Sequence, residues 1–355
     1  MKPLEEILEI NEINQWIRRF SRSPQQRNVA HGADAELIEI NGNDGQWLAV
    51  TIDTVSEEII KGIYQDPFTM GWVTVMSSFS DLAAVGADPI GMVVSVSVEP
   101  NRDRIFCDRI ALGMQAACSQ LGVWILGGDT NTSPLINLTG CALGLVPRKN
   151  HLTRIGCKPG DKVFLSGPAG AGSAIGLARI SGLSPAIFPE SAYRPAARIK
   201  EGRILRDYAS CCMDTSDGVL ATLDQLMRLN SVGFAITENP KSILRKDAAM
   251  LADSTQIPSW AMLAGHHGEF ELLFTIPPEK TASFLSEASR INWTPLPIGI
   301  VIRDTEIQLS LDNHLQKIDT GAIRNLFVQY GDHPGIYVQK LLNMIIESRR
   351  NVICS

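Results

Sequence analysis

The sequence has no apolar run that approaches the roughly 20 residues of a membrane-spanning helix. Its N-terminal segment is acidic early and lacks the apolar core of a secretory signal. Basic residues are not in excess, since 32 Lys and Arg against 38 Asp and Glu give a net charge of −6. This charge disfavours nucleic acid and anionic membranes as main partners. We therefore expect a cytoplasmic protein that binds neither.

Paired cysteines and one common nucleotide-binding motif are also missing. The seven cysteines are scattered, their number is odd, and no C-x-x-C occurs, which argues against a disulfide framework. Most lie in apolar surroundings, as buried free thiols do, and this favours a reducing compartment. No G-x-x-x-x-G-K-[ST] is present, so the chain is not a P-loop protein.

The length of 355 residues exceeds what one hydrophobic core usually supports, so two domains are expected. We place the connector in the basic, turn-rich stretch 148–162. The predicted parts are an N-terminal domain (1–150), a C-terminal domain (151–330) and a helical tail (331–355). Strand and helix patterns alternate along both domains, which predicts an α/β (α+β) fold. The clearest predicted elements are strands at 47–53, 90–98, 123–129 and 136–146 and helices at 3–20, 67–85, 101–121 and 278–289.

Aspartates stand at the ends of apolar strands or inside stretches of small residues. Asp81 is the most unusual, because it interrupts the uncharged stretch SSFSDLAAVGA. Burying an unpaired carboxylate is costly, and too few Lys or Arg lie nearby in the sequence to pair with them all. A divalent cation would offset the charge, and Mg²⁺ together with a nucleotide is the combination that such carboxylates favour. The set is Asp34, Asp53, Asp81, Asp129, Asp214 and Asp217.

Some of these features have a purely structural interpretation. Asp214 and Asp217 each precede an expected helix start and could be helix caps. The turn GPAGAG could cradle a phosphate through its N–H groups, although tight strand–helix packing explains it at least as well. The stretch LGGDT is a stronger signal, because its glycines allow close approach of a ligand where Asp129 leaves a strand.

Six ordered blocks resemble the thiamine-monophosphate kinases, within the superfamily of aminoimidazole ribonucleotide synthetase. Order and spacing agree over roughly residues 30 to 305. The blocks are AVTIDT, SDLAAVGADP, GGDTNTSP, LTRIGCKPGD, DTSDGV and FELLFT, which match the family patterns S-T-D-T, S-D-x-A-A-M-G-A-x-P, G-G-D-T-T-x-x-P, L-x-R-S-G-A-x-P-G-D, D-x-S-D-G-L and Y-E-L-L-F-T.

The resemblance implies an N-terminal domain that dimerises through its sheet, a C-terminal α/β domain, and ATP with several Mg²⁺ ions in the cleft between them. It assigns metal binding to the six aspartates and to Thr51, which stands where a Ser is usual. Nucleotide contacts fall on Gly128, Asp129, Arg154 and Ser216. We assign catalysis to Asp129, Asp217 and Arg154, since phosphoryl transfer needs mainly positioning and charge stabilisation.

The departures from the family affect one of the metal sites and most of the acceptor side. Ala33 replaces the first carboxylate of G-D-D, and Ile52 replaces the Thr of S-T-D, so oxygen donors are lost. Ile60 stands at the position of a His that contacts thiamine phosphate, and Gly268 at that of an acceptor-binding Glu. We therefore expect a thiamine-monophosphate-kinase-like enzyme that uses Mg-ATP on a different small-molecule acceptor.

The stretch AGHHGEFELLFT resembles a transition-metal site but lies where the acceptor should bind. We interpret His266, His267 and Glu269 as a changed acceptor wall, with Glu269 in the role of the displaced Glu. Two alternatives remain. One is an ATP-dependent synthetase or dehydratase of the same superfamily that activates an amide or carbonyl, for which Cys354 offers a weak resemblance. The other is a non-catalytic nucleotide-binding homologue, favoured by the losses at Ala33 and Ile52.

Overall fold

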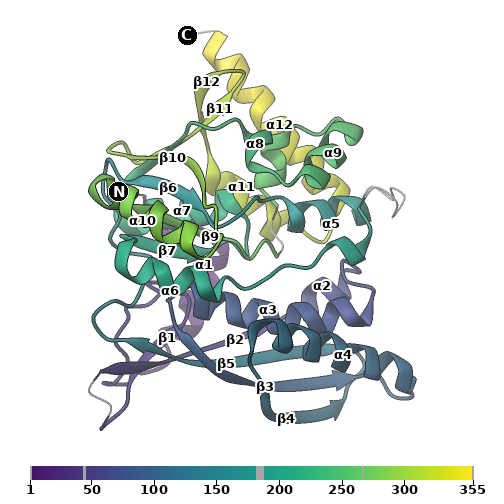
Figure 1. Ribbon diagram of the computed structural model, residues 1–355. Coiled ribbons are helices and arrows are strands. Elements are labelled where there is room, and N and C mark those ends of the chain that lie inside the picture. The colour runs from purple at the N-terminus through teal and green to yellow at the C-terminus, as the bar shows by residue number, and fades with distance from the viewer. Residues whose placement is uncertain (1, 43–44, 181–187, 266–267, 354–355) are drawn as a thin grey trace.

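The computed structural model describes residues 2–42, 45–180, 188–265 and 268–353. Two β-sheets lie one above the other with helices between them (Figure 1). One sheet collects strands from the first half of the chain, and the other collects strands from the second half. The expected two-sheet α/β architecture is therefore confirmed.

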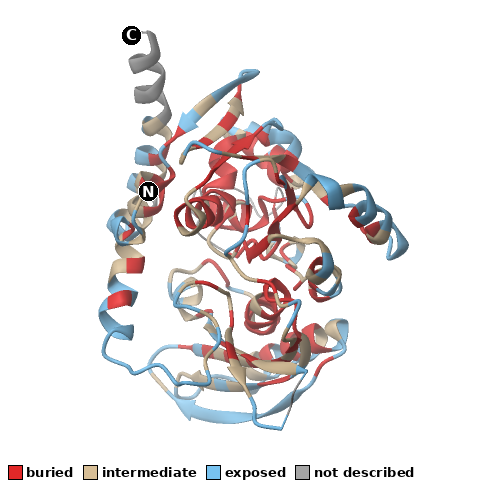
Figure 2. Ribbon diagram, turned by 90° about the vertical axis from the view of Figure 1, so that its left-hand side faces the viewer, coloured by how far each residue is buried: buried red, intermediate tan, exposed pale blue. Residues whose placement is uncertain are grey.

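The first sheet has the order β1-β2-β5-β3-β4. Only β3 and β4 are parallel, and the helix α4 (Arg104–Leu121) connects them. All other neighbours are antiparallel. Helices α3 and α4 cover one face of this sheet, and its other face stays exposed (Figures 1 and 2). Its strands are β1 (Glu36–Glu39), β2 (Gln46–Thr54), β3 (Asp88–Val98), β4 (Ile125–Thr132) and β5 (Asn137–Pro147).

Helix α3 (Pro67–Ala84) lies between the two sheets and is buried on nearly all sides. Its start follows the predicted signals: the Asp66 carboxylate accepts the N–H of Phe68 at 3.2 Å, and Pro67 is the first helical residue. Gly86 follows its end with φ of +71°, a conformation that glycine adopts without strain. The helix therefore carries Asp81 into the middle of the molecule.

The second sheet has the order β12-β11-β8-β10-β6-β9-β7. Phe164, Phe274, Phe284 and Trp293 pack together in its core. Its strands are β6 (Lys162–Leu165), β7 (Cys211–Asp214), β8 (Gly233–Ile236), β9 (Leu272–Ile276), β10 (Leu296–Ile302), β11 (Ile307–Leu311) and β12 (His314–Ile318). The larger helices around it are α5 (Ala171–Ile180), α6 (Ile199–Tyr208), α7 (Val219–Asn230), α9 (Lys246–Thr255), α10 (Pro278–Arg290), α11 (Thr320–Tyr330) and α12 (Pro334–Ile353).

The N-terminal segment, with helix α1 (Leu8–Ile17), packs against the second half of the chain. Arg228 of α7 donates to the carbonyl of Pro3 at 2.7 Å and forms an ion pair with Glu6 at 2.9 Å. The N–H of Leu8 donates to the side chain of Asn325 in α11 at 2.9 Å. In space α1 thus lies with the C-terminal half of the chain. The division into domains 1–150, 151–330 and 331–355 stays a prediction.

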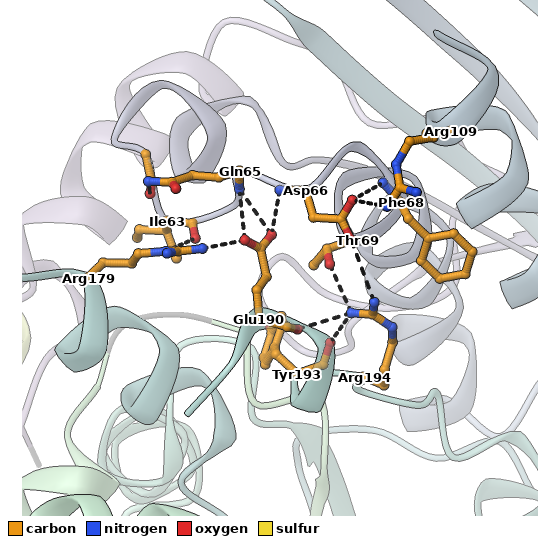
Figure 3. A network of polar contacts seen from close by, with 11 residues as sticks. Ile63, Gln65, Asp66, Phe68, Thr69, Arg109, Arg179, Glu190, Tyr193 and Arg194 are labelled. Atoms are coloured by element: carbon orange, nitrogen blue, oxygen red, sulfur yellow. Dashed lines mark hydrogen bonds and ion pairs between the residues drawn. The ribbon is translucent and has the colours of Figure 1, made fainter. Parts of the chain in front are cut away.

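A polar network joins the two halves where α3 begins (Figure 3). The Glu190 carboxylate accepts the N–H groups of Gln65 at 3.0 Å and Asp66 at 2.9 Å and is ion-paired with Arg179. Arg194 donates to the hydroxyl of Thr69 at 2.8 Å. These contacts fix the relative position of the two halves at the start of α3. Across the described residues, no helix has both the length and the apolar character needed to cross a bilayer.

Candidate metal and nucleotide site

Three carboxylates from distant parts of the sequence meet between the two sheets. Oxygen atoms of Asp34, Asp81 and Asp214 all lie within 4.8 Å of one another, and we call them the aspartate triad. Asp34 precedes β1, Asp81 lies in α3, and Asp214 ends β7. Both halves of the chain therefore build the site.

Hydrogen bonds orient each carboxylate of the triad. Arg154 makes a two-pronged ion pair with Asp34, at 3.2 Å from Nε and 2.9 Å from Nη2. Asp81 accepts the hydroxyl of Thr51 at 2.5 Å. Asp214 accepts the hydroxyls of Ser80 at 2.8 Å and Ser216 at 3.0 Å. The side chains are held by the fold before any ligand binds.

The triad carries more negative charge than its surroundings neutralise. Burial raises the pKa of Asp81 well above its usual range, and the charges of Asp214, Asp53 and Asp34 raise it further. Burial and the charge of Asp34 raise the pKa of Asp214 to about 7, although Arg154 lowers it. One guanidinium cannot balance three buried carboxylates. A preformed, negatively charged site of oxygen donors fits Mg²⁺. Asp34, Asp81 and Asp214, which the sequence predicts as metal ligands, would bind it directly.

Two further predicted residues, Thr51 and Asp53, lie beside the triad, and a third, Asp217, follows β7. Thr51 and Asp53 occupy alternate positions of β2 and so face the same side of the sheet, toward α3. Burial, together with the charges of Glu58 and Asp217, raises the pKa of Asp53 to about 6. Asp217 is not a helix cap, because Gly218 precedes α7 and no side chain caps that helix. The cap interpretation therefore fails for Asp217.

Asp129 lies apart from the aspartate triad of its own chain. Asp53, Gly140, Val94 and Gly128 are successive cross-strand partners and share the covered face of the first sheet. Asp129 is the neighbour of Gly128 and faces the other side, where it accepts the side-chain N–H of Asn131 at 2.6 Å. Gly128 meets a neighbouring strand, since a Cβ there would lie 2.1 Å from the carbonyl of Val94. Metal and nucleotide contacts at Asp129 and Gly128 stay predictions.

Ile52 also points away from the triad. Its side chain is 70% exposed on the uncovered face of the sheet, opposite to Thr51 and Asp53. An oxygen donor at this position would therefore not reach the triad of its own chain, and its replacement by Ile52 leaves the triad intact. Ala33, by contrast, packs against the core next to Asp34.

The turn GPAGAG already has an anionic partner. Glu269 is buried, and its carboxylate accepts the N–H groups of Ala171 at 2.8 Å and Gly172 at 3.3 Å. Burial raises the pKa of Glu269 to about 7. In this structure the N–H groups at the start of α5 bind Glu269. The turn therefore fits the packing explanation, not the phosphate-binding one. His266 and His267 lie outside the described residues.

Sequence reasoning missed Glu9 of α1. Burial and the charge of Asp217 raise the pKa of Glu9 to about 7, and Arg324 is its ion-pair partner at 3.5 Å. Glu9 of α1 is thus held by Arg324 of α11 and senses the charge of Asp217, although these residues are far apart in the sequence. An amphipathic helix with several glutamates gives no local signal for this, because only tertiary packing selects one of them.

The raised pKa values predict a pH-dependent effect of Mg²⁺ on stability. In the metal-free protein, the folded state holds a proton on Asp214 up to about pH 7, whereas the unfolded state releases it near 3.8. Stability contributed by this group therefore falls as the pH rises through that window. Mg²⁺ binds the ionised form, so the increase in Tm on adding MgCl₂ should be larger at about pH 8 than at about pH 5. Calorimetry with NaCl of equal ionic strength as control tests this, and equal increases at both pH values would contradict it.

Comparison with known proteins identifies an AIR synthase-related protein. The sequence model described as "AIR synthase related protein, N-terminal domain" matches residues 32–146. The thiamine-monophosphate kinase of Pyrococcus horikoshii is 33% identical over 278 residues, which cover 78% of this chain and 86% of that protein. The chain therefore belongs to the thiamine-monophosphate kinase family, whose members are ATP-dependent enzymes.

Solved structures show the same fold. The crystal structure of tt0281 from Thermus thermophilus superposes with a TM-score of 0.73 at 25% identity, over 84% of this chain and 95% of that one. AaThiL complexed with AMPPCP and TMP superposes with a TM-score of 0.69 at 22% identity, over 90% of this chain and 99% of that one.

Proposed function

We propose that this chain transfers the terminal phosphoryl group of Mg-ATP to a small-molecule acceptor in the cleft between its two halves. The observation that carries the proposal is the aspartate triad with its single guanidinium partner, Arg154. The complex of AaThiL with AMPPCP and TMP supports a nucleotide and a phosphate-bearing acceptor in this fold. Mg²⁺ would neutralise charge on the transferring phosphates.

The residues of the chain would share the work as follows. Asp34, Asp81 and Asp214, with Asp53 and Thr51 beside them, would hold Mg²⁺. Arg154 fixes Asp34 and adds positive charge at the same place. Ser216 and Asp217 stand between β7 and α7, within reach of a nucleotide phosphate that approaches the triad. Gly128 and Asp129 complete the proposed nucleotide contacts.

We propose further that the acceptor differs from thiamine monophosphate. Gly268 occupies the position of the family's acceptor-binding Glu, and no side chain fits there. Its φ is +49°, and a Cβ would lie 2.1 Å from the hydroxyl of Tyr193, which donates to the Gly268 carbonyl at 2.7 Å. Glu269 is engaged by the N-terminus of α5. The packing at Gly268 supports a different acceptor contact, and the roles of His266, His267 and Glu269 remain predictions.

Measurement of ADP release with a coupled assay tests this function. We expect saturable, Mg²⁺-dependent ATP binding, and no ADP release with thiamine monophosphate above the rate with ATP alone. A thiamine-monophosphate kinase of the same family, assayed in parallel, is the positive control. Robust turnover of thiamine monophosphate would disprove the changed acceptor, and lack of ATP binding would disprove the kinase. ATP binding without ADP release for any acceptor would favour a non-catalytic homologue.

We propose a homodimer that forms through the uncovered face of the first sheet. Ile52 and Val93 are both cross-strand partners of Cys141 on this face, and Trp124 and Leu126 beside them are 68% and 54% exposed. A second copy of the chain would bury these apolar side chains. Asp129 lies on the same face, so it would stand at the interface.

We keep the cytoplasmic location as a proposal. Cys107, Cys118, Cys141, Cys157, Cys211 and Cys212, the cysteines in the described part of the chain, are all free thiols. Free buried thiols are typical of proteins in reducing compartments.

A further inference from the structure

A pocket outside the triad lies where five elements meet. Its volume is about 340 Å³, within the range of small-molecule sites. Its walls come from the segment after α2 (Ser56–Ile60), from α5, the 3₁₀ helix η3 (Ser259–Leu263), α11 and α12. We call it the α12 pocket. Helices α11 and α12 lie beyond residue 305, where the similarity in sequence motifs to the family ends, so the family motifs do not account for this wall.

Helix α12 is anchored as part of this wall. Leu341 is 5% exposed, and the hydroxyl of Tyr337 donates to the carbonyl of Ala264 at 3.3 Å. The ring of Tyr337 meets that of Phe327 in α11 edge-on, with centroids 5.9 Å apart. The pocket therefore has a built wall on its C-terminal side.

The lining is mostly apolar and contains no carboxylate among the described residues. Its charged members are Lys61 and Arg179, which are cationic and paired with Glu57 and Glu190. The ammonium group of Lys61 also lies 4.6 Å from the ring centroid of Phe327. A cationic group would lose its hydration beside Lys61 and Arg179, and the described lining offers it no carboxylate, whereas an uncharged apolar group loses no hydration energy of this kind.

One end of the pocket borders the proposed catalytic cleft. Gly265 lines the pocket and touches Gly218, the residue after Asp217: a Cβ on Gly218 would lie 2.1 Å from the carbonyl oxygen of Gly265. Ser173 lines the same end and packs against Gly265. A ligand in the pocket would thus have one end next to the start of α7, where Asp217 stands.

We propose that the α12 pocket holds the apolar part of the phosphoryl acceptor, and that this acceptor carries no positive charge. The proposal rests on the phosphoryl-transfer function proposed above and names its substrate class. Thiamine monophosphate carries a thiazolium cation and does not meet this requirement. An aromatic or aliphatic alcohol, or its phosphate monoester, does.

Two branched aliphatic residues of α12 provide a matched pair of variants. Val338 lines the pocket, whereas Ile336 is 44% exposed and lies outside it. The probe is 8-anilinonaphthalene-1-sulfonate, an anionic aromatic dye, followed by its fluorescence in the full chain. We expect Val338→Trp to weaken dye binding by about tenfold or more, because the indole fills the pocket, and Ile336→Trp to leave it unchanged. Equal dye affinity in the two variants would overturn the proposal.

Two competitors with the same phosphate group separate the charge classes. 1-Naphthyl phosphate should displace the dye from the unmodified chain, and thiamine monophosphate should not. Displacement by thiamine monophosphate at the same concentration would refute the exclusion of cations. Mg-ATP binding is measured in parallel for every variant. If Mg-ATP fails to bind, the proposed function is wrong, whereas a failure of the dye and competitor experiments alone refutes the acceptor class.

Discussion

Asp81→Asn should abolish most Mg-ATP-dependent activity and at the same time raise the Tm of the metal-free protein at neutral pH. Asp81 is the member of the triad whose pKa burial and neighbouring carboxylates raise well above its usual range. A neutral amide removes the cost of burying or protonating this carboxylate beside Asp34 and Asp214 and still accepts the hydroxyl of Thr51. Loss of the residues that hydrogen-bond metal ligands lowers metal affinity or activity about 10- to 100-fold. Loss of a direct ligand should therefore lower activity about a hundredfold or more.

Opposite changes in stability and activity distinguish a metal ligand from a structural residue. Substitution of an Asp with a purely structural role would lower both stability and activity. Asp108→Asn, on the exposed side of α4, is the control and should change neither. Calorimetry without metal, Mg²⁺ titration and ADP release, measured on the same preparations, provide the comparison. A variant with unaltered Mg²⁺ dependence would show that Asp81 does not bind the metal.

Arg154→Met should destabilise the protein by about 3–5 kcal/mol, because it leaves the Asp34 carboxylate buried without its cation. The Asp34 side chain is fully buried and Arg154 makes two bonds to it. The double variant Asp34→Asn, Arg154→Met should recover part of the loss, since no unpaired charge remains. Saturating Mg²⁺ should also recover part of the loss in Arg154→Met, because the metal would replace the guanidinium as counter-charge.

Urea unfolding measures these differences in free energy. Arg104→Met is the control, since its side chain is 92% exposed and its ion pair with Asp108 at 3.7 Å should contribute little. A loss below about 1 kcal/mol in Arg154→Met, comparable to that for a surface pair, would mean that Asp34 has another counter-charge. The absence of any Mg²⁺ effect on this variant would argue against Asp34 as a ligand.

Local patterns predicted most of the elements. The Asp66–Pro67 start of α3, the strand at 47–53 and the end of α4 at Gly122 each follow from neighbouring residues, and Gly122 has a φ of +69°. The short strand β1, helix α2 and the pair β11–β12 were missed, because four or five residues carry too little periodicity.

The candidate site was predicted only in part, for a reason of geometry. The residue types identified Asp34, Asp81 and Asp214 as costly when buried, but their meeting depends on α3 packing between two sheets. The face on which a strand residue lies also needs the sheet: Asp53 faces the triad, whereas Asp129 and Ile52 face away from it.

The sequence alone determined the family, the alternation of strands and helices, and the demand of several aspartates for a cation, because motifs, periodicity and charge are local properties. The tertiary structure alone decided three other features. It brought the carboxylates within 4.8 Å of one another, occupied the N-terminus of α5 with Glu269, and enclosed a pocket with α12. Each of these depends on contacts between residues that are distant in the sequence, whose spacing no local pattern records.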